Sequence, residues 1–378
     1  MKNSFGKNIQ ITLFGESHGE TIGVVIDGLA PGLAIDLGYI QKRMEQRKAK
    51  GRISTQRHEA DEFRIVSGWF EGYTTGTPLT ILIDNTNTRS QDYEQTRYRL
   101  RPSHADYTAY EKYLGYQDFR GGGHFSGRIT APLVAAGAIA QQILESKGIL
   151  IGTHILKCHQ VSDEPFAQEE EQLSAQINKL NGLEFPVLDE ERAQDMHALI
   201  TAAAERGDSV GGILETAICG LPAGIGEPFF DSIESVLSHL LFSVPAVKGV
   251  QFGLGFGFAD LFGSEANDPF CSKEGRIRTA TNHNGGVNGG ISNGMPILIQ
   301  SVIKPTASIF RPQQTVDYLS ARPVELQIKG RHDPAIIHRA RVVVDSVCAL
   351  GLLDLCCERQ GNLSMRKDPL RTKTEERS

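Results

Sequence analysis

The feature that most constrains the fold of this 378-residue chain is an internal repeat of short glycine-containing motifs. Gly15-Glu-Ser-His-Gly19 near the start resembles Gly207-Asp-Ser-Val-Gly211, and a Gly-Leu pair follows each opening glycine after thirteen residues, at Gly28 and at Gly220. Two further pairs of matches follow in the same order, Gly76-Thr-Pro with Gly294-Met-Pro and Gly127-Arg128 with Gly330-Arg331. Repeated motifs in one order predict a duplicated unit, with halves at about residues 1–150 and 200–360.

Each half has the pattern strand, glycine-rich turn, helix, further strands and a long helix. Apolar alternation predicts strands over residues 22–27 and 213–218. Helical spacing predicts four helices, over residues 35–47, 129–146, 231–242 and 335–355. Helices as apolar as these are buried. We therefore expect one α+β domain over about residues 1–360, an internally duplicated β-α-β sandwich with a helical layer between two antiparallel sheets.

Two segments depart from this pattern. Between the halves, Glu169-Glu-Glu171 and Asp189-Glu-Glu191 make the chain acid-rich, which indicates a surface insertion over about residues 160–198. The last residues, 366–378, are polar, and we expect them to be disordered.

Composition excludes several classes of protein. With 39 Lys and Arg against 45 Asp and Glu, the net charge of −6 argues against a surface that coats nucleic acid. The six cysteines lack C-x-x-C or metal-ligand spacing, so neither a disulfide framework nor a metal site is expected. The sequence contains no apolar run long enough to span a membrane and no signal peptide at its start. We expect a cytoplasmic protein without membrane or nucleic-acid partners.

Two histidines lie in small, polar motifs that neither helix nor core packing explains, His18 in Phe14-Gly-Glu-Ser-His-Gly19 and His104 in Arg101-Pro-Ser-His. Arginines with few acidic neighbours in the sequence surround them, namely Arg47, Arg52, Arg57, Arg89, Arg101 and Arg128. Guanidinium groups bind phosphate and carboxylate with two parallel hydrogen bonds. The pattern favours a pocket for a small polyanion. The alternatives are a core or capping role for His18 and a solvated face for the basic run over residues 42–57.

Two glycine clusters also indicate binding loops. Arg120-Gly-Gly-Gly-His-Phe-Ser-Gly-Arg128 leads into a predicted helix, and backbone N–H groups at a helix start suit an anion. The segment 282–294 contains three Asn-Gly pairs, and its backbone could approach a planar ligand. The alternative is that both are only turns. Gly253-Leu-Gly-Phe-Gly257 lacks the spacing of a dinucleotide fingerprint.

Seven motifs together carry a resemblance to one family. They are Phe14-Gly-Glu-Ser-His-Gly19, Asn85-Thr-Asn-Thr-Arg-Ser-Gln-Asp-Tyr93, Arg101-Pro-Ser-His-Ala-Asp-Tyr-Thr108, Gly207-Asp-Ser-Val-Gly-Gly212, Gly289-Gly-Ile-Ser-Asn-Gly294, Lys304-Pro-Thr-Ala-Ser-Ile309 and Gly330-Arg-His-Asp-Pro334. In these motifs and their order, from about residue 5 to 357, the chain resembles the chorismate synthases.

The resemblance implies a lyase of the shikimate pathway of aromatic amino-acid biosynthesis. Its reaction is the 1,4-anti elimination of phosphate from 5-enolpyruvylshikimate 3-phosphate, which gives chorismate and requires reduced FMN without net redox change. The resemblance also implies a helical layer between two antiparallel sheets and a homotetramer. NADPH would be used only if the chain reduced its own flavin, and otherwise a separate flavin reductase would be a partner.

Site residues follow from the same resemblance, position by position. It places catalytic roles on His18, His104, Ser17, Ser126 and Asp333. It places substrate anions on Arg47, Arg52, Arg101 and Arg128. It places FMN contacts on His124, Phe125, Ser126, Ala246, Gly289, Lys304, Pro305, Thr306, Ala307, Ser308 and Arg331. In these roles His18 would protonate the departing phosphate, and His104 would stabilise the reduced, anionic flavin.

The chain departs from the family's usual motifs at two places. His124-Phe125 stands where the family often has arginine and serine, and Glu45-Gln46-Arg47 replaces a frequent arginine triplet, which weakens any nicotinamide phosphate site there. Two other functions remain alternatives. A redox flavoenzyme would oxidise NAD(P)H without a shikimate-derived substrate, and a nucleotide- or nucleic-acid-binding module would use the arginines without His18 and His104.

Overall fold

The structure is a computed structural model that describes residues 2–49, 51, 53–54, 61–86, 97–273, 275–328 and 332–364. Within these residues, two five-stranded antiparallel sheets form the frame of the molecule. The first sheet has the order β1 (Ser4–Phe5), β2 (Gln10–Phe14), β3 (Thr21–Asp27), β7 (Leu79–Asp84) and β4 (Phe63–Ser67). In β7, the buried Leu79, Ile81 and Ile83 alternate with more exposed residues, as expected of a strand with one face on a core.

The second sheet has the order β11 (Val247–Phe252), β16 (Ile297–Ile303), β10 (Gly212–Cys219), β8 (Leu150–Cys158) and β9 (Val161–Ser162). Its central strand β10 is buried without interruption from Leu214 to Cys219. The strand is buried because two helices contact it, α5 (Glu170–Leu180) and the long α9 (Ile337–Ser364).

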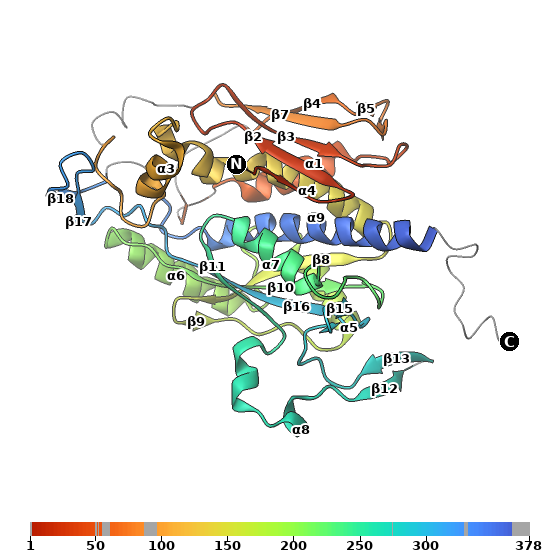
Figure 1. The fold of residues 1–378 in the computed structure, drawn as a ribbon. Coiled ribbons are helices and arrows are strands. Elements are labelled where there is room, and N and C mark those ends of the chain that lie inside the picture. Colours follow the sequence, from red (N-terminus) through yellow and green to blue (C-terminus); the bar gives the residue numbers. More distant parts are fainter. Residues whose placement is uncertain are drawn as a thin grey trace.

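Four helices fill the space between the two sheets, as Figure 1 shows. They are α1 (Leu37–Arg47), α4 (Thr130–Glu145), α7 (Ile233–Ser243) and α9. Helix α4 packs on β3 and β7, α9 packs on β8 and β10, and the two helices pack on each other. Their closest approach requires a glycine, because a Cβ atom at Gly137 would lie 2.2 Å from the Cβ atom of Ser346.

Both sheets connect their strands in the same way. In the first sheet the spatial order is β2-β3-β7-β4, and in the second it is β8-β10-β16-β11. Among these four strands of each sheet, the second in sequence, β3 or β10, lies between the first and the last in sequence. A helix, α1 or α7, follows β3 or β10 along the chain. The predicted strands and all four predicted helices are confirmed, with ends that differ by one or two residues except that α9 continues nine residues beyond its predicted end at residue 355. The mixed α+β class is confirmed as well.

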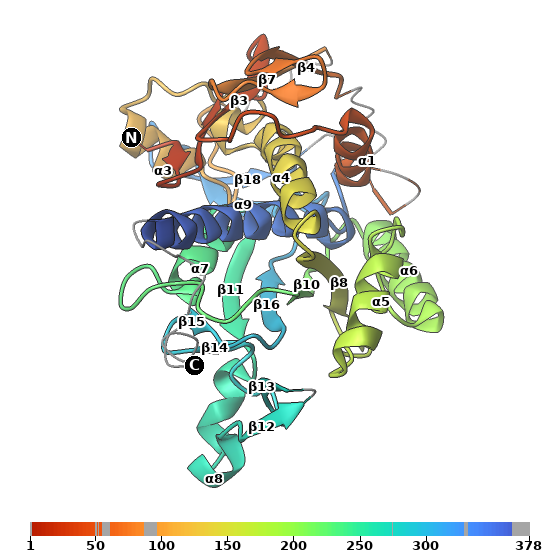
Figure 2. The ribbon, with the colours of Figure 1, turned by 90° about the vertical axis from the view of Figure 1, so that its right-hand side faces the viewer.

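Smaller elements decorate this frame. They are β5 (Trp69–Phe70), β6 (Tyr73–Thr74), α3 (Asp106–Tyr113), η1 (Arg120–Phe125), η2 (Gly127–Ile129), α6 (Glu190–Glu205), η3 (Gly255–Asp260), α8 (Gly263–Ala266), β12 (Phe270–Lys273), β13 (Arg276–Thr279), β14 (Val287–Asn288), β15 (Ile291–Ser292), β17 (Gln313–Val316) and β18 (Pro323–Leu326). Helix α8 and the hairpin β12–β13 project from the far end of the second sheet, and we call residues 255–279 the arm (Figure 2).

The acid-rich segment between the halves is folded. It forms β9, α5 and α6, and the buried residues Leu173, Ile177 and Leu180 of α5 pack with Ala217 and Cys219 of β10 in a second apolar cluster. The predicted tail over residues 366–378 lies outside the described residues. Among the described helices, none combines the length and the apolar character that crossing a membrane would need.

Candidate active site

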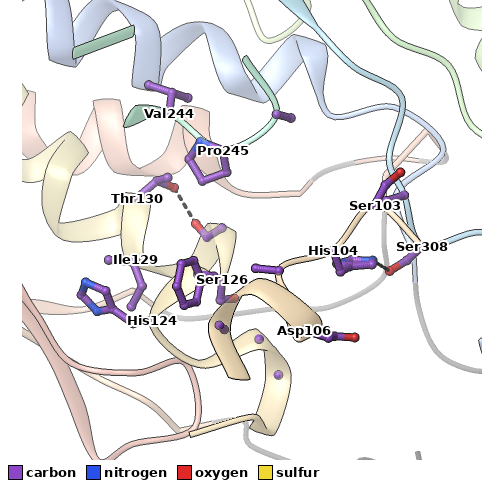
Figure 3. Close-up of a pocket in the computed structure, with 18 of the residues that line it drawn as sticks. Ser103, His104, Asp106, His124, Ser126, Ile129, Thr130, Val244, Pro245 and Ser308 are labelled. Carbon is purple, nitrogen blue, oxygen red and sulfur yellow. Dashed lines mark hydrogen bonds between the residues drawn. The ribbon is translucent and has the colours of Figure 1, made fainter. Parts of the chain in front are cut away.

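A cavity of about 1690 Å³ lies at the end of the helical layer where α4 and α9 begin and α7 ends. Both halves of the chain supply its wall. From the first half come the turn of His18, α3 and the glycine-rich segment before α4, and from the second half come residues 239–248, 304–308 and the start of α9. Figure 3 shows part of this wall, with His124 and Ser126 on one side and His104 and Ser308 on the other.

The wall of the cavity is basic although the chain is acidic overall. Its positively charged residues are Lys2, Arg47, Arg97, Arg99, Arg101, Lys248, Lys304 and Arg339. Its carboxylates are Asp106, Asp118 and Asp333. Such an excess of cations in a concave site raises the local concentration of an anionic ligand. The cavity therefore has the charge expected of a polyanion pocket, and the identity of its ligand stays a prediction.

The first predicted histidine, His18, lies in a tight turn. The turn closes with a hydrogen bond from the Gly19 N–H to the Glu16 carbonyl, 3.0 Å, and the Ser17 N–H donates to the Gly123 carbonyl, 3.1 Å. A Cβ atom at Gly121 would lie 2.2 Å from the His18 ring, so the glycine-rich segment can approach the imidazole only because it lacks side chains. Residues 121–123 all have positive φ angles.

The Ser17 hydroxyl lies between a backbone carbonyl and the ring of His18. The Ser17 hydroxyl lies 3.1 Å from the Gly121 carbonyl, to which it can only donate, and 3.0 Å from His18 Nδ1. In the arrangement where the hydroxyl donates its single hydrogen to the carbonyl, it accepts from an Nδ1–H group of His18. The Nε2 atom of His18 is then the nitrogen that gains and loses a proton.

The second predicted histidine, His104, lies on the opposite wall, where its Nε2 atom and the Ser308 hydroxyl are 2.8 Å apart (Figure 3). Burial and, after it, the charges of Arg101 and Lys304 outweigh the carboxylate of Asp106 and together lower the pKa of His104 to about 4. The imidazole is therefore neutral near pH 7. A neutral ring would act on a flavin by hydrogen bonding rather than by charge, and the role of His104 at the flavin stays a prediction.

The predicted anion-binding arginines are held by carboxylates. Arg101 donates to both oxygens of Asp106, at 2.8 and 2.6 Å, and lines the cavity. Arg47 also lines the cavity and lies 2.5 Å from Asp61. Arg128 bonds the other oxygen of Asp61 and stands behind the wall rather than in it. Arg52 lies outside the described residues.

Most of the predicted flavin contacts lie on the cavity wall. Those that line it are His124, Phe125, Ser126, Ala246, Lys304, Pro305, Thr306, Ala307 and Ser308. The His124 Nδ1–H donates to the Gly15 carbonyl over 2.8 Å, so Nε2 of the neutral ring is an acceptor. Gly289, in contrast, lies in the turn between β14 and β15 and does not line the cavity. Arg331 lies outside the described residues.

The remaining predicted catalytic groups also meet at this cavity. Asp333 lines it and accepts a hydrogen bond from Arg339 over 2.5 Å. Ser126 caps η2 by accepting from the Arg128 N–H, 3.3 Å. His18 and Asp333, which are separated by more than three hundred residues, thus share one cavity because the loops of both halves end at the same side of the helical layer.

Four residues that contact predicted site residues were not predicted from the sequence, namely Asp61, Asn85, Asp106 and Arg339. Asp106 and Asn85 stand inside the quoted motifs, so their motifs were a signal, although no role was attached to them. Arg339 follows a predicted catalytic aspartate by six residues, which is too far for a local rule. Asp61 stands between Glu59 and Glu62 after a basic stretch, and nothing in this local sequence marks it, rather than either glutamate, as the partner of two arginines.

Comparisons with known proteins agree on one family. Residues 9–357 match the family described as chorismate synthase. A chorismate synthase of Thermococcus gammatolerans is 45% identical over 360 residues, which cover 94% of this chain and 98% of that protein. One of Dehalococcoides mccartyi is 44% identical over 356 residues, which cover 94% and 96%. A crystal structure of a chorismate synthase superposes with a TM-score of 0.74 at 26% identity and covers 94% of each chain. The chain therefore belongs to the chorismate synthase family.

Proposed function

We propose that the cavity is where this chain carries out the reaction of its family, the 1,4-anti elimination of phosphate from 5-enolpyruvylshikimate 3-phosphate to give chorismate. The chain is a lyase, and its place in the shikimate pathway follows from the family. The observation that carries the proposal is the meeting of His18, His104 and eight cationic side chains around one cavity in an acidic protein. The substrate has a phosphate and two carboxylates, which match that charge.

The cavity also fits FMN beside the substrate. Sites for one small molecule are about 300–1,000 Å³, whereas this cavity has about 1690 Å³ and so has room for two ligands. Buried polar atoms without a hydrogen-bond partner among the described lining residues include Gln117 Oε1, Thr306 Oγ1 and His332 Nε2. Buried polar atoms are normally satisfied, so these three favour a polar ligand.

His124, Phe125, Ser126, Ala246 and the residues 304–308 would hold the flavin, together with Arg331. Lys304 would supply positive charge, while His104 and Ser308 would offer a neutral hydrogen-bonding pair. When bound, reduced FMN supplies the electron density that helps the allylic C–O bond to break and is regenerated without net oxidation. Gly289 is left out of this set because it lies away from the cavity wall.

The chain's own residues handle the protons and the leaving group. His18 donates a proton from Nε2 to the departing phosphate, since Ser17 holds Nδ1–H as a fixed donor. Asp333, oriented by Arg339, assists removal of the ring proton. Ser126 contributes a hydroxyl next to the flavin site. These roles place the acid and the base on opposite halves of the chain.

The substrate's anions are bound by the arginines. Arg47 and Arg101 line the cavity and are fixed in place by Asp61 and Asp106. Arg52 is assigned to the same clamp by the family resemblance. Arg128 lies behind the residues that line the cavity. It contributes its positive charge there and forms an ion pair with Asp61. Fixed guanidinium groups lose little freedom when they bind an anion, which favours affinity.

Three finer features belong to the same proposal. The equal strand order of the two sheets supports a duplicated unit. A homotetramer is supported by the arm, where Phe256, Phe262, Phe270 and Ile277 are 86%, 77%, 71% and 77% exposed, because large exposed apolar groups mark interfaces. A cytoplasmic location, with reduced FMN supplied by a flavin reductase or by NADPH, completes the proposal.

Anaerobic turnover with prereduced FMN tests this function. We expect chorismate and phosphate in equal amounts, with many turnovers per flavin. Consumption of one reduced flavin per product would contradict the absence of net redox change. Steady oxidation of NAD(P)H without the shikimate-derived substrate would favour a redox flavoenzyme instead.

A further inference from the structure

We propose that Asn85 is a positioning residue that holds the turn of Ser17 and His18 and links it to Arg128. Asn85 follows directly after β7, and its side chain reaches the turn that carries His18. The inference rests on the proposed function, because it assumes that His18 acts on the substrate.

The contacts of Asn85 determine its orientation. Its amide nitrogen donates to the Glu16 carbonyl over 3.0 Å and to the Gly19 carbonyl over 2.9 Å. Its amide oxygen accepts from Arg128 Nε over 3.0 Å. Both carbonyls can only accept and a guanidinium can only donate, so the amide cannot be turned around. In each of these three hydrogen bonds of the Asn85 amide, the partner can act only as an acceptor or only as a donor.

The two carbonyls that Asn85 holds belong to the first and last residues of the His18 turn. The Glu16 carbonyl also accepts from the Gly19 N–H, which closes the turn. The other side of the turn is held by Gly121 and Gly123 through Ser17. Asn85 and the glycine-rich segment therefore both hydrogen-bond to the turn of His18, from two sides. The position of the His18 imidazole depends on both sets of hydrogen bonds.

The same amide connects His18 to the buried arginine network. Asp61 bonds Arg47 and Arg128, and Arg128 bonds Asn85 and the carbonyl of Asp84. The network thus runs from an arginine at the cavity wall to the turn of His18. No other side chain of similar size can accept from Arg128 and donate to two carbonyls. Aspartate would still accept from Arg128, but it cannot donate to the turn.

The Asn85→Asp variant separates positioning from general stability. A misplacement of about 1 Å can cost about a hundredfold in rate, and we expect kcat to fall by about tenfold to a hundredfold while KM stays nearly unchanged. In a His18→Ala background there is no imidazole to position. There, Asn85→Asp should change kcat by no more than about a factor of two.

Asn181 offers a matched control. Its amide oxygen lies 3.4 Å from Nη1 of both Arg43 and Arg341, and its nitrogen donates to the Ile151 carbonyl over 3.0 Å, away from the cavity. Asn181→Asp should therefore leave kcat unchanged even if it lowers the melting temperature as much as Asn85→Asp does. Should Asn85→Asp fail to fold, Asn85→Ala, which introduces no charge, is to be put through the same double-mutant cycle.

The outcomes distinguish this inference from the function on which it rests. If His18→Ala alone keeps a normal kcat, the proposed role of His18 is wrong and the positioning role is wrong with it. If His18→Ala is impaired as expected but the Asn85 substitution lowers kcat by the same factor in both backgrounds, only the inference about Asn85 is overturned. Non-additive losses, with normal activity in Asn181→Asp, support it.

Discussion

The carboxylate of Asp61 lies 2.5 Å from the guanidinium of Arg47, and both side chains are almost fully buried. The second oxygen of the same carboxylate bonds Arg128. Burial raises the pKa of Asp61, but the charges of Arg47 and Arg128 outweigh it and hold the pKa below its usual value. One carboxylate therefore neutralises part of the charge of two predicted substrate-binding arginines, and it fixes their geometry before any ligand binds.

Replacing Asp61 by asparagine should destabilise the fold strongly. Breaking a buried ion pair by removing one partner costs about 3–5 kcal/mol, because the remaining charge is left without compensation. Here two guanidinium groups would lose that compensation. Urea unfolding of Asp61→Asn should show a loss of this order. Asp84→Asn is the control, since the ion pair of Asp84 with Arg64 is exposed and its removal should have little effect. If Asp61→Asn loses no more unfolding free energy than Asp84→Asn, Asp61 does not stabilise the fold by neutralising the two arginines.

Replacing His18 by alanine should remove the general acid and leave flavin binding intact. Loss of such a group lowers kcat by about a hundredfold to ten-thousandfold. The affinity for reduced FMN should stay near normal, because the predicted flavin contacts lie on other parts of the wall. An anaerobic fluorescence titration together with turnover measurements checks both statements. Weak flavin binding in His18→Ala would instead place this imidazole at the flavin.

Lys304, more than His104, should control the ionisation of bound reduced flavin. A nearby cation favours an anionic flavin, and the ammonium of Lys304 is charged, whereas the pKa of His104 is lowered to about 4. Lys304→Gln should therefore raise the pH at which bound reduced FMN becomes anionic by more than His104→Ala does. Anaerobic absorbance titrations of both variants measure this. Lys273→Gln, on the arm, should leave the titration unchanged. If the ionisation of bound reduced FMN shifts more in His104→Ala than in Lys304→Gln, His104 and not Lys304 is the cation beside the flavin.

The helices and central strands could be predicted because their apolar patterns are local. Residues 129–146 are apolar nearly all round, and the structure places α4 over Thr130–Glu145 in the middle of the helical layer. The meeting of His18 and His104 at one cavity could be predicted only through the family resemblance, because periodicity says nothing about which loops converge.

Other features could not be predicted because they depend on distant contacts. The sequence shows Arg128 as a cation without nearby acids, but folding brings Asp61 against it from 67 residues away. The sequence also cannot show that burial keeps His104 neutral. Gly289 carries a family motif, yet its turn lies at β14–β15, away from the cavity of the same chain. In each of these cases the tertiary structure, not the local motif, decides the role.

A buried histidine far from the cavity should make stability depend on pH. His154 lies between two carboxylates, with Nδ1 3.0 Å from Asp163 and Nε2 3.0 Å from Glu215. Because carboxylates accept, both ring nitrogens must donate, and the ring is an imidazolium. Burial lowers the pKa of His154, but the two carboxylates raise it more. These contacts tie the segment after β9 to the second sheet, since Asp163 also accepts from the N–H groups of Leu188 and Asp189.

The sign of the pH dependence follows from the raised pKa. The imidazolium contributes its full stability below the unfolded-state pKa of about 6.5 and loses it as the pH rises through the higher folded-state pKa. The difference in unfolding free energy between the wild type and His154→Gln should therefore be greatest below about pH 6.5 and shrink as the pH rises through the raised folded-state pKa. His338 provides a control of opposite sign, because burial lowers its pKa to about 3. For His338→Gln the difference should instead shrink as the pH falls below about 6.5. Urea unfolding of both variants across this range tests the assignment, and an offset for His154→Gln that does not change with pH would mean that the ring is not charged in the folded protein.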